Sequence, residues 1–241
     1  MKKTICLLLL AVAISFLSCK DKTNEFAEQH FTTNQISSAL KDCITLTSMR
    51  TANTLCIVDS ANQALGFYKY QDSIYRLVLP PSVKAVVDTL TNHGYENTID
   101  SLIFNMNRAA EKTNNKVKQF WEVEVESITF PNPNQLLYGG SNAITKYVKE
   151  TKQSTFISEL ISSILKEQFD ILHVVTTWNE LQLNYLEITS IYSSFDILAS
   201  TAQQMAEHFF AIMAIEEAKI RKDPSLRGSP NGILFKVFAN L

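Results

Sequence analysis

The chain has 241 residues, of which 46% are hydrophobic and 19% are charged, and its formal net charge is −2 at pH 7. This hydrophobic content is too high for an intrinsically disordered protein. A mildly acidic chain lacks the basic stripe that binds phosphate backbones, so we expect no nucleic-acid partner. Only six glycines, few alternating runs and no βαβ succession argue against a sheet-based fold. We therefore expect an all-α fold, an irregular multi-helix bundle.

The first eighteen residues have the pattern of a secretory signal. Two lysines precede an apolar run that ends at Leu17, and this run is too short for a comfortable membrane span. Ser18 is followed directly by Cys19. A cysteine after a small residue resembles a bacterial lipoprotein signal, in which that cysteine is acylated. We expect residues 1–18 to be removed and Cys19 to be the lipid attachment site.

This signal implies an exported protein anchored by lipid in the bacterial envelope. It would face the periplasm or the cell surface, with the outer membrane as the expected membrane. Because Phe16 and Leu17 stand where Leu and a small residue are usual, a conventional signal cut nearby is the alternative. Removal of residues 1–18 leaves 20 basic and 24 acidic side chains, a net charge of −4. Residues 19–33 are polar and predict a flexible tether, and residues 34–241 predict a single helical domain.

The helical period begins at Asn34 and predicts helix in pieces to about Leu65, with a stop at Gly66. Cys43 and Cys56 both fall on this helix. Thirteen residues at about 1.5 Å each place them about 20 Å apart, beyond disulfide reach. We expect two buried thiols.

The next elements are bounded by prolines and glycines. Pro80-Pro81 marks a break, and Ser82 is the expected N-cap of a helix that Gly94 ends. A helix is expected over 97–112, continuing after an irregularity to about residue 128. Within it, Trp121, Val123 and Val125 alternate with glutamates, so a strand is the competing interpretation.

The second half of the chain is expected to be helical to its end. Pro131 and Pro133 force a break, and Gly139-Gly140 forms a second break, after which Ser141 is the expected cap. Helices are predicted over 142–150, 153–168, 170–188, 196–222 and 233–240.

Two of these helices carry charged residues beside their apolar stripes. On the first, Asn107 and Glu111 are four residues apart on one flank, and Arg108 can reach Glu111. On the long C-terminal helix, the angular count places Glu216 in the middle of the apolar stripe and Glu217 on its flank.

A carboxylate on a core-facing line is costly unless it is paired, and arginine is its natural partner. We therefore expect Glu216 to be largely buried and bonded to Arg108, with Arg221 or Arg227 as the next candidates. The polar cluster as a whole has two interpretations. It is a structural ion-pair network between helices, or a carboxylate pair that performs acid–base or ligand-binding work in a cleft. The candidate residues of this cluster are Asn107, Arg108, Glu111, Glu216, Glu217, Arg221 and Arg227.

No metal site or cofactor is expected. The four histidines are scattered, and none has the carboxylate partners of a di-metal bundle. No nucleophile elbow, P-loop or dinucleotide-binding pattern is present in the sequence.

Several segments resemble the bacterial family known as domain of unknown function 4197. The resemblance lies in Phe-Asn-Met-Asn-Arg-Ala-Ala-Glu-Lys (104–112), Ile-Glu-Glu-Ala-Lys-Ile-Arg-Lys-Asp-Pro-Ser-Leu-Arg (215–227), Leu-Phe-Lys-Val-Phe (234–238), Ile-Thr-Phe (128–130), Gly139-Gly140, Ala-Ile-Thr-Lys-Tyr (143–147) and Leu79-Pro80. Their order and spacing agree over about residues 34–240. The chain departs from the family at Asn134, where an acid is usual, and at Trp121, where Phe is usual. The resemblance implies a helical, exported domain and no particular activity.

Two functions are compatible with these observations. The first is a lipid-anchored, non-enzymatic envelope protein that acts by binding or scaffolding a protein or small molecule. The second is a hydrolase-like enzyme that uses Glu111, Glu216 and Glu217. They differ in one structural expectation: an enzyme would place these carboxylates at the base of an open cleft, whereas a scaffold would bury each one against an arginine.

Overall fold

The computed structural model describes residues 30–56, 67, 75–239 and 241, and residues 31–241 form one compact unit. Residues 1–18, Cys19 and most of the tether lie outside the described residues, as do Leu65 and Gly66. All regular structure in the described part is helical, which confirms the all-α fold. None of the described helices combines the length and the apolar character needed to cross a membrane.

The helices of this unit follow one another with short connections. Short 3₁₀ turns lie at Pro81–Val83 and Pro224–Leu226, and a π-helical segment lies at Leu160–Ile164. The α-helices are α1 (Thr33–Leu55), α2 (Lys84–Asn92), α3 (Glu96–Glu111), α4 (Asn114–Ser127), α5 (Pro133–Leu137), α6 (Ala143–Glu159), α7 (Leu165–Ile171), α8 (Val174–Thr189), α9 (Ile197–Lys222) and α10 (Ile233–Phe238).

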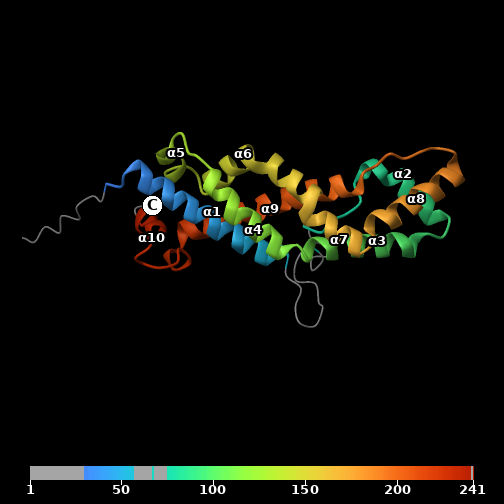
Figure 1. Cartoon of the computed structure of the whole chain (residues 1–241), viewed down its shortest axis with the longest axis horizontal. Helices are drawn as coiled ribbons and strands as arrows, with labels where there is room; N and C mark the ends of the chain where they lie inside the picture. Colours follow the sequence, from blue (N-terminus) through green and yellow to red (C-terminus); the bar gives the residue numbers. More distant parts are fainter. Residues whose placement is uncertain (1–29, 57–66, 68–74, 240) are drawn as a thin grey trace, which may run out of the picture. The chain divides into compact units, whose positions relative to one another are not determined.

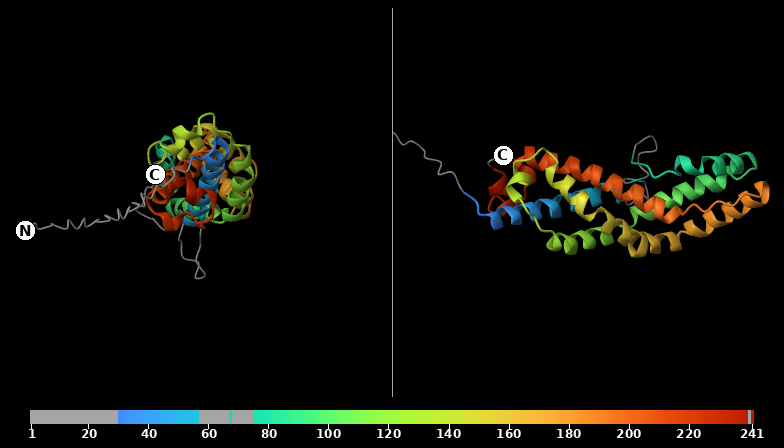
Figure 2. Two further views of the ribbon diagram at one scale, coloured as in Figure 1. Left: turned by 90° about the vertical axis from the view of Figure 1, so that its left-hand side faces the viewer. Right: turned by 90° about the horizontal axis from the view of Figure 1, so that it is seen from above.

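Helix α9 connects the two ends of this unit. It packs against α1 and α6 along its C-terminal half and also contacts α7 and α8 (Figure 1). Helices α5 and α10 gather beside α1 at one end, whereas α2, α3 and α8 pack together at the other (Figures 1 and 2). Because α9 reaches both groups, its apolar face is shared by the whole unit.

An aromatic cluster forms the centre of the core. The ring of Trp121 on α4 stacks on Phe209 of α9, with centroids 5.6 Å apart and ring planes 4° apart, and Phe156 and Phe210 close around it. Such offset and edge contacts add to the energy of burial. Val123 is 74% exposed. The alternation around Trp121 is therefore one buried stripe of a helix, which confirms the helical interpretation.

The expected break between residues 150 and 153 is wrong. Helix α6 runs unbroken to Glu159 and continues through the π-helical segment into α7. The chain leaves the helical path at His173, whose φ of 55° lies in the left-handed region. A π-segment adds a residue to one turn, so the apolar pattern on its two sides falls out of phase.

Of the expected helix ends, the one at Gly94 is confirmed, whereas the caps formed by Thr32 and Asp196 were not predicted. Thr32 forms a capping box with Gln35, the Asp196 side chain accepts from Ala199 N, and Gly94 ends α2 with a φ of 89°. Two expected caps are wrong: Ser82 lies inside a 3₁₀ turn, and Ser141 precedes Asn142, the N-cap residue of α6.

Cys43 on α1 and Cys56, the C-cap residue of this helix, are free and buried, as expected. The Sγ atom of Cys56 lies 3.8 Å from Oγ1 of Thr113. Burial raises the pKa of Cys56 to about 12, and burial together with the Glu217 carboxylate raises the pKa of Cys43. Neither thiol is poised as a nucleophile, because the thiolate is the reactive form.

Candidate functional site

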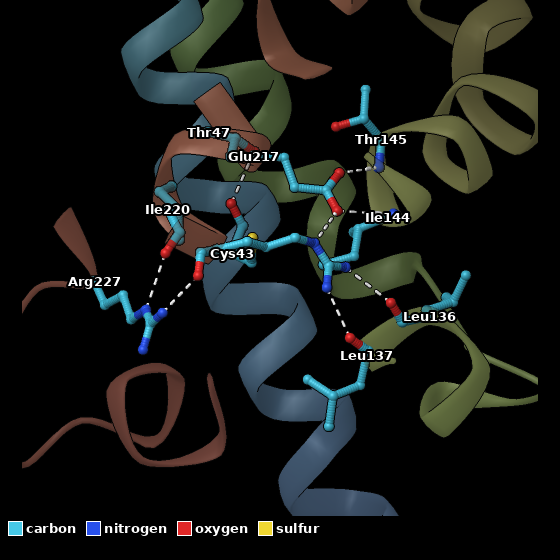
Figure 3. A network of polar contacts seen from close by, with 10 residues as sticks. Cys43, Thr47, Leu136, Leu137, Ile144, Thr145, Glu217, Ile220 and Arg227 are labelled. Atoms are coloured by element: carbon cyan, nitrogen blue, oxygen red, sulfur yellow. Dashed lines mark hydrogen bonds and ion pairs between the residues drawn. The ribbon is translucent and has the colours of Figure 1, made fainter. Parts of the chain in front are cut away.

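The Glu217 carboxylate lies at the N-terminus of α6. Its side chain has no solvent exposure. Oε1 accepts from the backbone N–H of Ile144 at 3.1 Å, and Oε2 accepts from that of Thr145 at 2.7 Å (Figure 3). Both donors belong to the first turn of α6, so a side chain of α9 caps another helix.

This contact supplies what the local sequence of α6 lacks. The first N–H groups of a helix have no hydrogen-bond partner within the helix. The positive end of the helix dipole also lies at the N-terminus, so an anion is favoured there. Asn142 occupies the N-cap position, but its side chain forms no capping hydrogen bond. The Glu217 carboxylate therefore replaces a local cap and fixes α9 against α6.

Arg221 extends this contact to α5 and α10. Its Nε donates to Oε1 of Glu217 at 2.8 Å, and its terminal nitrogens donate to the carbonyls of Leu137 at 2.7 Å and Leu136 at 2.8 Å. The guanidinium also lies over the Phe238 ring, 5.5 Å from its centroid. Carbonyls at a helix C-terminus lack partners within the helix, so Arg221 satisfies the end of α5.

The Arg227 side chain caps the C-terminus of α9. Its Nε donates to the carbonyl of Ile220 at 2.9 Å, and Nη2 donates to that of Arg221 at 2.7 Å (Figure 3). These carbonyls belong to the last turn of α9. A cation there also complements the helix dipole. Arg227 is therefore a helix-terminus residue and makes no ion pair with Glu216.

Glu216 is buried, as predicted, but its expected partner is wrong. Oε2 accepts from Nε of Arg50 at 3.2 Å, and Oε1 accepts from Nζ of Lys219 at 2.6 Å. Arg108 is paired elsewhere. The sequence contained no signal for Arg50, because only the packing of α1 against α9 brings these two side chains together.

The three candidates on α3 form a separate group. The side chain of Asn107 forms two hydrogen bonds with the backbone of Leu77. Oδ1 of Asn107 accepts from the N–H of Leu77 at 3.0 Å, and Nδ2 of Asn107 donates to the carbonyl of Leu77 at 2.8 Å. Nη1 of Arg108 donates to Oε2 of the buried Glu111 at 2.7 Å. Among the described residues, no hydrogen bond or ion pair joins this group to the charges of α9.

A hollow of about 550 Å³ lies beside the Arg221 guanidinium, between the α5–α6 loop and the end of α9. We call it the Arg221 pocket. Its lining contains two cations and, within the described part of the chain, no acidic side chain. Glu216 and Glu217 do not line it. The lining residues are Tyr138, Gly139, Ser141, Ala218, Arg221, Lys222 and Leu241.

Gly139 allows the loop to turn closely under this pocket. A Cβ atom there would lie 2.7 Å from Cβ of Ala143 and 2.8 Å from the carbonyl oxygen of Gln135. Neither atom belongs to a flexible side-chain end, so any larger residue would displace the loop.

The contacts determine which chemistry these residues can perform. Glu217 is enclosed and accepts three hydrogen bonds from Ile144, Thr145 and Arg221, so it has no route to a solute. No group of three or more potential metal ligands occurs within the residues that the structure describes. The lining of the Arg221 pocket includes the side chains of Arg221 and Lys222. Another hollow, of about 500 Å³, is lined by Lys116, Glu124 and Glu159 among others.

Comparison with known proteins identifies the family. Neither curated proteins nor solved structures give a match. The family model described as "Protein of unknown function (DUF4197)" matches residues 30–239, nearly the whole of the described unit. The chain belongs to the DUF4197 family.

Proposed function

We propose that this protein is a lipid-anchored, non-enzymatic component of the bacterial envelope that acts by binding a partner or small molecule. The anchor is proposed from the sequence, where a short apolar signal precedes Ser18 and Cys19. The binding role is proposed from the folded unit, in which Glu111, Glu216 and Glu217 are paired with arginines while the hollow beside Arg221 and Lys222 is open.

The observation that carries this proposal is the environment of Glu217. An acid–base catalyst must come within hydrogen-bond reach of its substrate. The Glu217 carboxylate is enclosed, bridges α9 to α6 and is paired with Arg221. Glu216 and Glu111 are likewise paired with Arg50 and Arg108. This arrangement favours the structural interpretation of the cluster over the hydrolase-like alternative.

The anchor is tested by fractionation and mass spectrometry. Wild-type protein should partition into detergent with the membrane fraction, and its mature N-terminus should carry acyl chains on Cys19. Cys19→Ala should lack this modification. An unmodified mature N-terminus in the wild type would contradict the anchor.

The enzymatic alternative has its own test. A panel of ester, phosphate-ester and glycoside substrates should show no turnover that depends on Glu111, Glu216 or Glu217. A hydrolytic activity that Glu216→Gln abolishes without lowering the melting temperature would move this residue from a structural to a catalytic role.

A further inference from the structure

An apolar surface is exposed at the end of α8, in the group formed by α2, α3 and α8 (Figures 1 and 2). Its side chains are those of Leu183, Ile188, Ile191 and Tyr192, which are between 36% and 71% exposed. The described part of the chain has twelve exposed large hydrophobic side chains, so a third of them fall within ten consecutive positions. Exposed apolar side chains gathered in this way mark a contact surface.

Packing within the unit does not account for Leu183. The buried residues of this part of α8 are Trp178, Leu181, Gln182 and Tyr185. At about 100° per residue, Leu183 lies on the opposite side of the helix from this buried stripe. Ile191 and Tyr192 follow Ser190, the left-handed residue with a φ of 59° that ends α8. These three apolar side chains therefore face solvent rather than the core.

Two carboxylates flank Leu183 on the same face. Glu180 lies three residues before it and Glu187 lies four residues after it, so the three side chains share one side of the helix. Both glutamates are exposed, and neither forms an ion pair within the residues that the structure describes. The sequence has no lysine or arginine between Lys166 and Lys219. We define the α8 surface as Glu180, Leu183, Glu187, Ile188, Ile191 and Tyr192.

The helices packed against α8 do not neutralise this charge. Helices α2, α3 and α7 each contain one basic side chain, which is paired with an acid of its own helix. The pairs are Lys84 with Asp88, Arg108 with Glu111, and Lys166 with Asp170. Glu96 and Asp100 of α3 are exposed and form no ion pair in the described part of the chain. The basic residues of α9 begin only at Lys219, in its last turn.

We propose that the α8 surface binds a basic amphipathic segment of a partner protein. Leu183, Ile191 and Tyr192 pack against the apolar side chains of that segment, and Glu180 and Glu187 pair with its lysines or arginines. Tyrosine is a frequent anchor of protein interfaces, and opposite charge selects the partner and speeds its approach.

Charge disfavours two other occupants. A second copy of the chain that met this surface with its own α8 surface would bring like charges together. The surface of a bilayer that contains anionic lipids is also negative. The proposal assigns a polypeptide partner to the binding role proposed above, and it depends neither on the lipid anchor nor on the Arg221 pocket.

Binding is tested by fluorescence polarisation on the full-length protein in a non-ionic detergent, with protein-free micelles as the baseline. The probe is a labelled helical peptide of leucine and lysine whose leucines lie on one face. A matched peptide carries glutamate in place of lysine. The leucine–lysine peptide should bind, and the leucine–glutamate peptide should bind about tenfold more weakly.

The apolar contact is tested by Leu183→Ser combined with Tyr192→Ser. This variant should bind the leucine–lysine peptide about tenfold more weakly, the effect of removing interface anchors. Val123→Ser on α4 is the matched control, because Val123 is more exposed than either residue and lies outside the α8 surface. It should bind as the wild type does. All three side chains are exposed, so the melting temperature should not change and lost binding would not reflect unfolding.

The electrostatic contact is tested by Glu180→Gln combined with Glu187→Gln. This variant should bind about fivefold more weakly, and its affinity should depend less on salt. Glu122→Gln combined with Glu150→Gln removes the same charge from exposed positions on α4 and α6. This control should retain the affinity and the salt dependence of the wild type.

The place of binding is read from hydrogen exchange, which should slow in residues 180–192 when the leucine–lysine peptide is bound. The proposal is overturned if this peptide does not bind, if the leucine–glutamate peptide binds equally, or if the control variants lose as much affinity as the α8 variants.

Two further results would overturn the polypeptide partner by assigning the α8 surface to another occupant. Self-association that Leu183→Ser with Tyr192→Ser abolishes would assign it to a second copy. A preference for anionic over zwitterionic vesicles that the same variant abolishes would assign it to a membrane. An unmodified Cys19 would contradict the anchor of the proposed function and would leave peptide binding unchanged.

Discussion

Glu216 and Glu217 are neighbours on α9 with different surroundings. The Arg50 and Lys219 side chains that pair with Glu216 are 33% and 55% exposed, so water can replace the carboxylate. The partners of Glu217 are buried N–H groups of α6 and the guanidinium of Arg221, which is 9% exposed. The angular count placed Glu217 on the flank of α9, and this flank faces α6, so Glu217 is the more enclosed of the two carboxylates.

Glu217→Ala should lower the free energy of unfolding more than Glu216→Ala does. It leaves the buried Arg221 and the first turn of α6 without their acceptor, which typically costs about 3–5 kcal/mol. Glu216→Ala should cost about 1 kcal/mol, because partly exposed pairs contribute little. Chemical denaturation monitored by circular dichroism measures both values. Equal losses, or a larger loss for Glu216→Ala, would contradict this contact assignment.

His208 makes stability depend on pH. It packs edge-on to Tyr75, with centroids 5.7 Å apart, and its Nδ1 atom has no hydrogen-bond partner. Burial lowers the pKa of His208 below 6.5, against an opposing effect of Glu207. The unfolded chain then takes up a proton at a higher pH than the folded chain does. Stability is therefore retained above pH 6.5 and is lost as the pH falls from 6.5 through the folded pKa.

The expected result is a lower melting temperature at pH 5.5 than at pH 7.5. His208→Gln removes this titration and should show a smaller difference. All other titrating groups are common to both proteins, including Asp42, whose pKa is raised by burial and by Glu126. Identical pH profiles of the wild type and the variant would exclude His208 as the source.

At the scale of elements, the α5–α6 loop offers a matched pair of substitutions. Gly139→Ala should destabilise the unit by about 1–3 kcal/mol, because its Cβ would overlap Ala143 and the Gln135 carbonyl. At Gly140 a Cβ would meet nothing within 4 Å, so Gly140→Ala should be near neutral. Thermal unfolding compares the two. A neutral Gly139→Ala would show that the loop can move aside.

Local signals predicted most helices, whereas long-range packing determined the site. The apolar period and Asp196 predicted α9 to within one residue, and Gly94 predicted the end of α2. The π-segment at Leu160–Ile164 was missed because it shifts the helical phase within one continuous helix. The pairing of Glu216 with Arg50 and the capping of α6 by Glu217 were missed for another reason. Both depend on how helices pack, which periodicity does not encode.

At the scale of the molecule, α9 ties the two ends of the unit together. Trp121 of α4 lies in the aromatic cluster with residues of α6 and α9. Trp178 of α8 packs on Phe195 in the connection between α8 and α9 and donates to its carbonyl. Because α9 contacts both regions, loss of one region exposes apolar surface of the other.

We therefore expect a single cooperative unfolding transition. In Trp121→Phe the fluorescence reports on Trp178, and in Trp178→Phe it reports on Trp121. Within each variant, the urea midpoint from fluorescence should coincide with that from circular dichroism. Separate midpoints would indicate that the two ends unfold independently.

The contact between Glu217 and α6 also has a consequence for the order of folding. The carboxylate that completes the first turn of α6 lies more than seventy residues further along the chain. Closing so long a loop is slow compared with forming a helix. We therefore expect the start of α6 to lack this acceptor until α9 has docked, so this contact should belong to the late stage of folding. Its strength then governs how long the folded state persists more than how fast it is reached.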